Sequence, residues 1–380
     1  MRQGIASIFT LGGLIRIVNK FRTQIMTHPI PDNNRYYRSL IIRHIQEEIP
    51  GVKTFALEPE DGKPLPYKAG QYLTLVHHST QGEVRRSYSI TSSPALQEPL
   101  TIGVKRIENG LFSRMLIDNA RVGDKLITTG AAGLFTLPEE GTAFKQIFFL
   151  AAGSGITPIY SLLKTLLHAR PELSAVLFYS NSYPEKTMFL KPLQELSTQF
   201  PERLHTEFLY SNSPDLSRAR LHKDLLQRFI SSLAKVPHDE LLFYICGPDN
   251  YMRLMSFALR QFGIPEPNIR KEIFNTDIRK PAKVIPPDTA AHQVTLHIGG
   301  NTHQIASRYP NNILQSARQA GIAMPYSCET GKCGSCLARV LKGKVWMSYN
   351  EVLTERDIEN GMTLTCVGFP VGGDVEMEIL

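Results

Sequence analysis

The segment CETGKCGSC, residues 328–336, holds three cysteines in a C-x4-C-x2-C spacing, and Cys366 follows later in the chain. This is the ligand spacing of a plant-type 2Fe-2S cluster. Gly331 and Gly334 allow the loop to curl, so that amide N–H groups can face the cluster sulfurs. The alternatives are a zinc site, which prefers two paired C-x-x-C elements, or disulfides. The spacing therefore predicts an electron-transfer protein whose iron ligands are Cys328, Cys333, Cys336 and Cys366.

Composition narrows the class of protein further. Only five cysteines occur in 380 residues, so a disulfide-stapled secreted protein is disfavoured and a reducing, cytoplasmic location is expected. A hydrophobic content of 42% with 20% charged residues is ordinary for globular proteins, and the length allows about two to four domains. No apolar stretch is long enough to span a bilayer.

The net charge of +7 is concentrated at the N-terminus, where residues 1–40 carry six Lys or Arg and one Asp. The rest of the chain is nearly balanced and shows no basic stripe with interleaved aromatics, so we expect no nucleic-acid partner. Residues 5–26 place Ile8, Leu11 and Ile15 at helical spacing with basic residues between them. Three interpretations stay open: a docked helix or disorder, peripheral membrane contact, or a targeting segment.

From about residue 35 to residue 142, short β-prone runs alternate with turn residues, which predicts an antiparallel β-barrel. The expected strands are 36–45, 52–57, 72–77, 86–90, 100–104 and 125–129. Within the fourth run, Arg86, Tyr88 and Ser89, followed by Ile90, supply a cation, a ring and a hydroxyl. A flavin needs these groups for its phosphate, its ring and its reactive nitrogen. Alone, such a run is more often a solvated edge strand.

A second part of the barrel region carries a turn before a helix-like segment, residues 114–119. Gly110 and Ser113 stand in this turn, so its free amides and the serine hydroxyl can meet a pyrophosphate at the helix N-terminus. The alternative is an ordinary turn with Ser113 as the helix N-cap.

From about residue 143 the pattern becomes strand, glycine turn and helix. A strand over 146–152 leads through Gly153, Gly155, Thr157 and Pro158 into a helix over 160–169. Further strands at 175–179, 206–210 and 241–245 alternate with helical segments, which predicts an α/β domain with a parallel sheet. The Gly-x-Gly turn is half of the usual dinucleotide fingerprint and is weak evidence alone.

The fourth strand of this domain runs into Cys246, Gly247 and Pro248. This second turn lies at the same carboxyl edge as the first, so both are expected to contact one nucleotide. By composition alone, Cys246 is more simply a small buried residue at the end of a strand.

Found together and in this order, over about residues 35–380, these motifs resemble the ferredoxin–NADP reductase superfamily in the arrangement flavin domain, nicotinamide domain and plant-type ferredoxin. The resemblance implies FAD, with Arg86 at its pyrophosphate, Tyr88 stacked on its ring and Ser89 near N5. It also implies that Cys246 lies beside the nicotinamide C4. Phe274 matches an aromatic residue that family members carry near the flavin ring. The implied cofactor-binding set also includes Ile90, Gly110, Ser113, Gly153, Gly155, Thr157, Pro158, Gly247 and Pro248.

The sequence departs from the family pattern at the residues expected to contact the 2′-hydroxyl or 2′-phosphate of the nucleotide. The second strand ends in residues 178–182, FYSNS, with neither an acid for a ribose hydroxyl nor an adjacent arginine for a 2′-phosphate. Lys186, Arg218 and Arg220 are candidate phosphate partners, which favours NADPH slightly, although each is also typical of a solvated surface. NADH and NADPH both stay open.

The expected domain boundaries follow from these segments: an N-terminal extension over 1–34, an FAD-binding barrel over 35–142, an NAD(P)-binding domain over 143–279, a proline-rich linker over 280–289 and a ferredoxin domain over 290–380. The ferredoxin domain is expected to have the β-grasp fold that the resemblance implies, with strands at 293–298, 302–305 and 374–380 and a helix over 312–320.

The expected cofactors suit a protein that takes two electrons from one donor and passes them on one at a time. A nicotinamide gives two electrons as a hydride, a 2Fe-2S cluster takes one, and a flavin exchanges either way. We therefore expect an NAD(P)H reductase that passes electrons through FAD and the cluster to a partner, for which relatives with this domain order suggest an oxygenase or hydroxylase. The alternatives are a membrane-bound desaturase or hydroxylase as acceptor, or a non-catalytic 2Fe-2S redox sensor or carrier.

Overall fold

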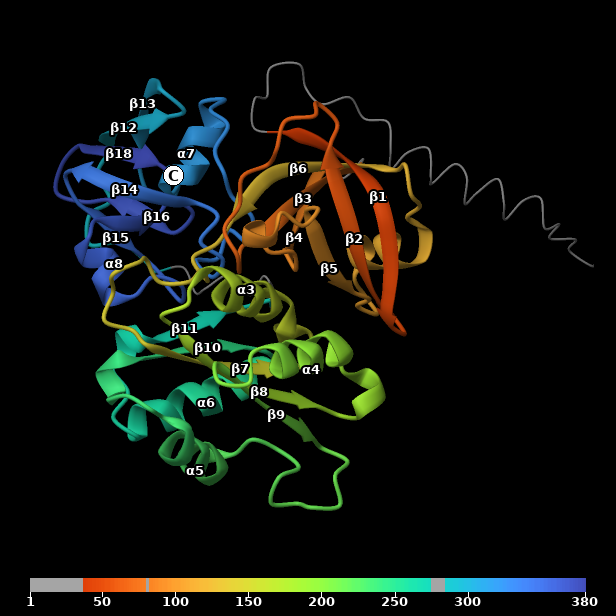
Figure 1. Cartoon of the computed structure of the whole chain (residues 1–380). Helices are drawn as coiled ribbons and strands as arrows, with labels where there is room; N and C mark the ends of the chain where they lie inside the picture. The colour runs from red at the N-terminus through yellow and green to blue at the C-terminus, as the bar shows by residue number, and fades with distance from the viewer. Residues whose placement is uncertain (1–36, 80–81, 275–283) are drawn as a thin grey trace, which may run out of the picture.

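The computed structural model describes residues 37–79, 82–274 and 284–380. Three domains follow one another along the chain: a β-barrel, an α/β domain and a mixed β domain, coloured red to orange, yellow to teal and blue in Figure 1. The predicted fold class is therefore confirmed. The expected N-terminal extension with its segment 5–26, and residues 280–283 of the expected linker, lie outside the described residues. None of the helices in the described ranges has the length and hydropathy needed to cross a bilayer.

The first domain is a six-stranded antiparallel sheet in the order β4-β3-β6-β1-β2-β5. An isolated antiparallel bridge between Ile90, directly after β4, and Ile102 of β5 links the two edge strands, so the sheet closes on itself. The side chains of Leu40, Leu73 and Leu75 are fully buried in its interior. The strands are β1 (Arg38–Ile49), β2 (Val52–Pro59), β3 (Tyr72–Ser79), β4 (Gly82–Ser89), β5 (Thr101–Lys105) and β6 (Lys125–Ala132).

The helix expected over 114–119 begins earlier than predicted. Helix α2 (Leu111–Arg114) continues directly into a π-helical turn, η2 (Met115–Asn119). Phe112 and Leu116 are buried in the barrel core, which explains why this segment packs across the barrel end. The 3-10 turn η1 (Pro94–Leu96) completes the domain and lies beside α3 of the next domain.

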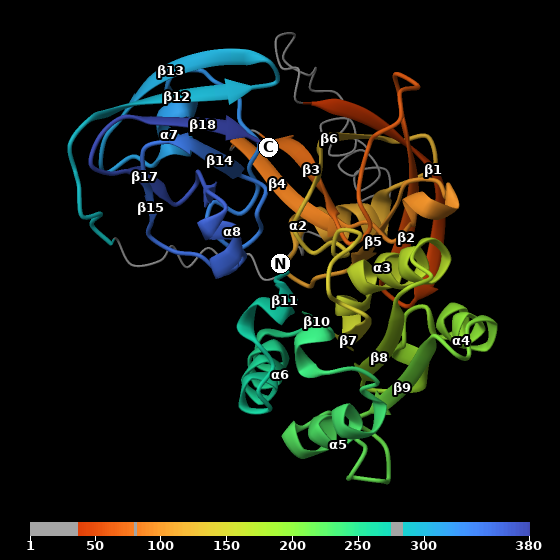
Figure 2. The ribbon, with the colours of Figure 1, turned by 60° about the vertical axis from the view of Figure 1, so that its left-hand side comes forward.

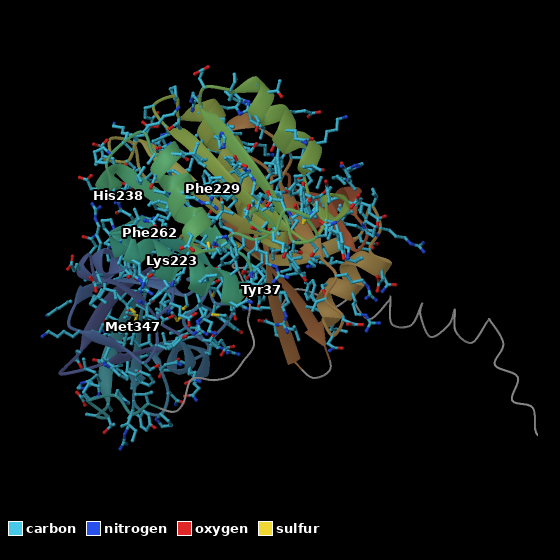
Figure 3. The ribbon with its side chains drawn as sticks, turned by 90° about the horizontal axis from the view of Figure 1, so that it is seen from below. Tyr37, Lys223, Phe229, His238, Phe262 and Met347 are labelled. Carbon is cyan, nitrogen blue, oxygen red and sulfur yellow. The ribbon has the colours of Figure 1, made fainter. Side chains whose placement is uncertain are left out.

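The second domain is a five-stranded parallel sheet in the order β11-β10-β7-β8-β9. Helices α3 and α4 cover one face and α5 and α6 the other, where Figure 3 shows Phe229 on α5 and Phe262 directly after α6. The elements are β7 (Gln146–Ala152), α3 (Ile156–Ala169), β8 (Ser174–Asn181), α4 (Leu190–Gln199), β9 (Leu204–Tyr210), α5 (Lys223–Leu233), β10 (Leu241–Cys246), α6 (Asp249–Gln261) and β11 (Ile269–Glu272), with 3-10 turns η3 (Gly153–Gly155), η4 (Pro184–Lys186), η5 (His238–Glu240) and η6 (Glu266–Asn268).

The fifth strand, β11, was not expected from the sequence. It has four residues, and its sequence IRKE lacks the apolar run that marks β7 and β10 as buried central strands. It pairs in parallel with β10 at the edge of the sheet. This strand carries the chain to the point where all three domains meet.

The third domain has a mixed five-stranded sheet in the order β13-β12-β18-β14-β16 and a two-stranded sheet of β15 and β17. Helix α7 begins with a capping box between Asn312 and Gln315, which satisfies amides at its start. Four strands and α8 were missed by sequence reasoning. The elements are β12 (His292–Ile298), β13 (Asn301–Ser307), α7 (Ile313–Gln319), β14 (Leu337–Lys342), β15 (Val345–Met347), α8 (Glu355–Glu359), β16 (Met362–Leu364), β17 (Gly368–Pro370) and β18 (Val375–Ile379).

The domains meet along defined surfaces. Helix α3 lies between the parallel sheet and the barrel, and its Ser161 hydroxyl donates to the Ser92 carbonyl oxygen of the barrel at 2.6 Å. Figures 1 and 2 both place β3 and β4 of the barrel beside the ferredoxin-like domain. The barrel therefore contacts both of its neighbours.

Replacing Phe178 with Ala should destabilise the α/β domain. Phe178 is fully buried, and its ring is stacked 4.9 Å from Phe229 and tilted 6.1 Å from Phe148. We expect the free energy of unfolding to fall by about 3–5 kcal/mol, the usual cost of such a cavity. Chemical denaturation followed by far-UV circular dichroism would measure it. The matched control is Phe257→Ala on α6, where the side chain is 52% exposed and little change is expected.

Candidate functional site

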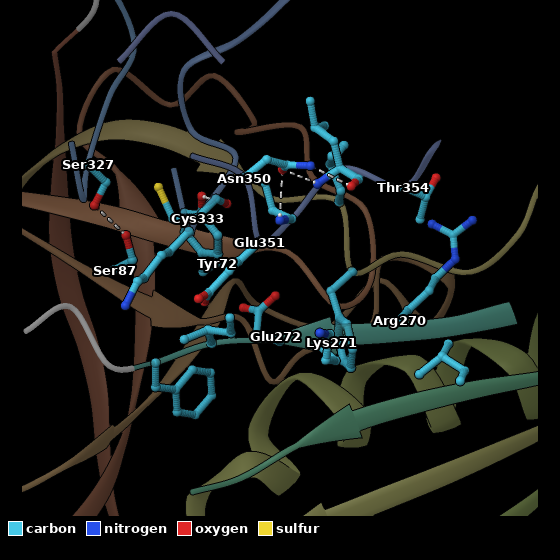
Figure 4. Close-up of a pocket in the computed structure, with 18 of the residues that line it drawn as sticks. Tyr72, Ser87, Arg270, Lys271, Glu272, Ser327, Cys333, Asn350, Glu351 and Thr354 are labelled. Atoms are coloured by element: carbon cyan, nitrogen blue, oxygen red, sulfur yellow. Dashed lines mark hydrogen bonds between the residues drawn. The ribbon is translucent and has the colours of Figure 1, made fainter. Parts of the chain in front are cut away.

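A cavity of about 380 Å³ opens where the three domains meet (Figure 4). The barrel contributes Tyr72 and Ser89, β11 and the residues after it contribute Glu272 and Phe274, and the third domain contributes Cys333. Three sequence-predicted residues thus line one space: Ser89 of the flavin motif, Phe274 and the cluster cysteine Cys333. The glycine turns of the α/β domain are not part of its lining. A cavity at a domain junction with a few polar groups is a typical cofactor site.

The barrel wall of this cavity fits a flavin. Ser89 is 4% exposed, and its hydroxyl has no hydrogen-bond partner within the described part of the chain. A buried hydroxyl without a partner is costly, so a ligand acceptor or donor is expected beside it. Tyr88, between Ser87 and Ser89 on the same strand, is not part of the cavity lining: its ring packs against the barrel core, 6.1 Å from Phe112. The exposed Arg86 donates to the Arg85 carbonyl oxygen at 2.7 Å and presents its guanidinium at the surface, where a phosphate can reach it.

The turn at Gly110 and Ser113 does not line the cavity. The Ser113 hydroxyl donates to the Gly110 carbonyl oxygen at 3.2 Å and accepts from the Ile107 N–H at 3.1 Å. A Cβ atom at Gly110 would lie 2.5 Å from the Ser113 oxygen, so glycine is required there. The serine hydroxyl is therefore engaged within the turn, and a contact between this turn and a pyrophosphate stays a prediction.

The two glycine turns of the α/β domain touch each other. A Cβ atom at Gly155 would lie 2.1 Å from the Cys246 carbonyl oxygen, and one at Gly247 would lie 2.8 Å from the Ala152 Cβ. Only glycine allows the ends of β7 and β10 to approach so closely. Thr157 caps its own turn by donating to the Ser154 carbonyl oxygen at 2.9 Å.

The prolines of these two turns stand at helix starts. Pro158 is buried in the first turn of α3, while Pro248 is the exposed N-cap of α6. A missing proline N–H costs no helical hydrogen bond at these positions. Both turns therefore present helix N-termini at one edge of the sheet, the arrangement that suits a dinucleotide.

Cys246 lies fully buried at the end of β10, and the strand register pairs it with Glu272 on β11. Burial, followed by the negative charge of Glu272, raises the pKa of the Cys246 thiol. Burial also raises the pKa of the Glu272 carboxyl to about 8. Both groups are therefore neutral at pH 7. Glu272 was missed by sequence reasoning, which singled out Phe274 two positions later; an acid that ends a strand is a weak signal without the fold.

Phe274 forms part of the cavity wall and is 41% exposed. Figure 4 shows Glu272 on the same segment, with Tyr72 and Cys333 across the space. The structure therefore brings together Ser89, Phe274 and Cys333, whereas Cys246 lies beneath the cavity wall and Arg86 outside it.

The four cysteines gather in the third domain and fit an iron–sulfur cluster. Cys328, Cys336 and Cys366 are buried and Cys333 is half-buried. The neighbouring Cys333 and Cys366 thiols hold the pKa of the Cys328 thiol below its ordinary value. The predicted amide donors are present in part: the Thr330 N–H points to the Cys328 sulfur at 3.4 Å and the Ser335 N–H to the Cys333 sulfur at 3.5 Å. The loop curls at Gly331 and Gly334, which both have positive φ.

The candidate phosphate partners differ in their surroundings. Arg218 forms an ion pair with Glu207, and its guanidinium lies 5.6 Å from the Phe229 ring. Lys186, in the turn after β8, lies 5.1 Å from the Tyr183 ring. Arg218 is therefore already paired with an acid, whereas Lys186 contacts a tyrosine ring in the turn after β8.

Comparison with known protein families agrees with this geometry. Three family models match in order: the oxidoreductase FAD-binding domain over residues 42–137, the oxidoreductase NAD-binding domain over 149–256 and the 2Fe-2S iron-sulfur cluster binding domain over 296–371.

Two curated relatives cover most of the chain. The chain is 34% identical over 322 residues to the ferredoxin reductase component of 3-ketosteroid-9-alpha-monooxygenase from Mycolicibacterium smegmatis, covering 82% of this chain and 87% of that protein. It is 30% identical over 349 residues to one of the subunits of 1,2-phenylacetyl-CoA epoxidase from Escherichia coli, covering 90% and 97%. Among solved structures, phthalate dioxygenase reductase matches with a TM-score of 0.54 at 24% identity, over 90% of this chain and 98% of that one, which shows a shared fold.

Replacing Cys246 with Ala should slow hydride transfer if the side chain lies beside the nicotinamide. We expect the rate of flavin reduction in a stopped-flow experiment to fall by about tenfold, the effect of about 1.4 kcal/mol on the barrier. The flavin content should not change, because Cys246 is not part of the barrel. An unchanged rate would leave Cys246 as a buried structural residue.

Replacing Glu272 with Gln should change how stability depends on pH. The folded protein holds the Glu272 proton more tightly than the unfolded chain, since the pKa rises from 4.5 to about 8. The wild type therefore loses stability relative to Glu272→Gln as the pH rises from about 5 to about 8, and the difference is constant above that range. Thermal unfolding of both proteins at several pH values would test this, and parallel curves would contradict it.

Proposed function

The chain belongs to the family of NAD(P)H-dependent flavin reductases with a C-terminal 2Fe-2S ferredoxin domain, and from this we propose that it is the reductase component of an oxygenase system. It is an oxidoreductase that transfers electrons from NAD(P)H through FAD and a 2Fe-2S cluster. The observation that supports the proposal best is the single cavity in which the flavin wall, β11 and the cluster loop meet.

The oxygenase is the acceptor that the relatives suggest. The two curated relatives are named as components of a monooxygenase and an epoxidase, and they match this chain over nearly their whole length. The Escherichia coli NADH oxidoreductase HCR, at 28% identity over 98% of its length, is a relative whose name specifies no oxygenase. The three-domain layout is common to both kinds, so the acceptor must be tested directly.

The residues divide the work between two cofactor sites. When bound, the flavin accepts an electron pair as a hydride and releases electrons singly. We assign Ser89 to the flavin N5 edge, Tyr88 to its ring and Arg86 to its pyrophosphate. We assign Cys246 and the neutral Glu272 to the nicotinamide site. Both are buried and uncharged, because burying a charged group there would cost free energy. Phe274 closes the cavity beside them.

An anaerobic visible titration tests the function. The purified protein, loaded with FAD and cluster, is titrated with NADPH and then with NADH. Bleaching of both flavin and cluster absorption by one nucleotide at lower concentration would support the relay and identify the nucleotide. NADPH is our first choice because of Lys186, and reduction by neither nucleotide would favour the redox sensor or carrier.

Replacing Cys333 with Ser should separate the two halves of the relay. Loss of one thiolate ligand is expected to remove the cluster and with it the reduction of one-electron acceptors such as cytochrome c. Flavin reduction by NAD(P)H should continue, because the FAD-binding and NAD-binding family models match other parts of the chain, residues 42–137 and 149–256. The readouts are the visible spectrum, acceptor reduction and flavin reduction measured side by side. Loss of flavin reduction as well would contradict a modular relay.

The basic segment 5–26 suggests a membrane-bound desaturase or hydroxylase as a second candidate acceptor. A helix with this charge pattern binds anionic bilayers in a salt-sensitive way. Pelleting with liposomes of anionic and neutral lipid, with residues 1–30 deleted as the control, tests this contact. If the full chain does not pellet with anionic liposomes, a water-soluble oxygenase is the better partner.

A further inference from the structure

Tyr72 of the barrel contacts the cluster loop, residues 328–336, which carries three of the four predicted iron ligands. Tyr72 of β3 is 4% exposed, and its ring lies so close to Gly133 that a Cβ atom there would be 2.9 Å from it. The Tyr72 hydroxyl lies 2.6 Å from the Cys333 carbonyl oxygen and 2.6 Å from the Ser335 hydroxyl. Figure 4 shows Tyr72 and Cys333 side by side at the cavity. The barrel is therefore hydrogen-bonded to Cys333, a predicted iron ligand, and to Ser335 two positions later.

The direction of these hydrogen bonds follows from counting protons. The Cys333 carbonyl oxygen can only accept, so the single Tyr72 proton goes to it. The Ser335 hydroxyl must then donate to the Tyr72 oxygen.

The Ser335 hydroxyl has a second possible acceptor. In this structure its oxygen accepts from the Cys333 thiol at 3.5 Å. As an iron ligand the sulfur would carry no proton, and the Ser335 hydroxyl could then donate to it. While Tyr72 accepts the Ser335 proton, that proton points away from the sulfur. A donor to a ligand sulfur stabilises the more negative, reduced cluster and raises its reduction potential.

We propose that Tyr72 is a positioning residue that keeps the cluster potential low by holding the Ser335 hydroxyl away from the Cys333 sulfur. This inference rests on the proposed function, because it requires a 2Fe-2S cluster bound by the four cysteines. A low potential makes the reduced cluster a stronger donor to the next acceptor.

The loop has further anchors that do not involve Tyr72. Arg85 of β4 donates to the Tyr326 carbonyl oxygen at 2.9 Å, and its guanidinium lies 3.6 Å from the centre of the Tyr326 ring. The Ser87 and Ser327 hydroxyl oxygens lie 2.9 Å apart. Removal of the Tyr72 hydroxyl alone should therefore leave the loop docked, so that a change in potential reports the hydrogen bond.

The test is a redox titration of the full chain loaded with FAD and cluster, at an electrode with mediators, followed by the electron paramagnetic resonance signal of the reduced cluster. Tyr72→Phe is expected to shift the potential upward, because Ser335 can then donate to sulfur. Ser335→Ala alone should cause little shift, since its proton does not reach sulfur in the wild type. The double variant should return to the wild-type potential or below it.

Tyr67→Phe is the matched control, because it removes another barrel hydroxyl, bonded to Ser92 at 2.8 Å. No shift is expected there. The proposal is overturned if Tyr72→Phe leaves the potential unchanged or lowers it, or if the upward shift persists in the double variant. Since electrons come from the electrode, this outcome is independent of nucleotide: a wild type that NAD(P)H does not reduce would sink the proposed function and leave this result standing.

Discussion

The docking of the cluster loop on β3 and β4 is the contact on which the arrangement of this protein depends. Electrons pass between cofactors only over short distances, so the barrel and the third domain must be held in a fixed relative position. Tyr72, Arg85 and Ser87 supply hydrogen bonds and a ring contact to residues on either side of the iron ligands. Two of these contacts are made to main-chain carbonyl oxygens, those of Cys333 and Tyr326, so they depend on the backbone conformation of this segment.

The nicotinamide domain is held to the same barrel on another side. Ser161 of α3 bonds the main chain at Ser92, and Lys164 forms an ion pair with Glu98. Burial lowers the pKa of Lys164, while the Glu98 partner opposes that shift. With both neighbours fixed to it, the barrel acts as the central support, and β11 enters the gap between them. This explains why the cavity forms at the junction and not within any one domain.

The site also concentrates groups that do not help the fold. Ser89 is buried with its hydroxyl unsatisfied in the described structure, and Glu272 is a buried carboxyl that keeps its proton at pH 7. Such groups lower stability, so they persist where a ligand or a reaction uses them. The apolar interiors of the barrel and of the parallel sheet offset this cost. Fold and function are thus supported by different residues of the same strands.

The sequence alone predicted the cluster ligands, and it determined the order of domains and most strands, because these are local signals. The spacing of Cys328, Cys333 and Cys336 reflects one loop, and the buried run of β7 reflects one central strand. Only the tertiary structure decided that Glu272 pairs with Cys246, that Tyr72 bonds the cluster loop and that short, polar β11 is a strand at all. These facts join residues far apart in the chain, and their physical cause is packing between elements, which no single segment encodes.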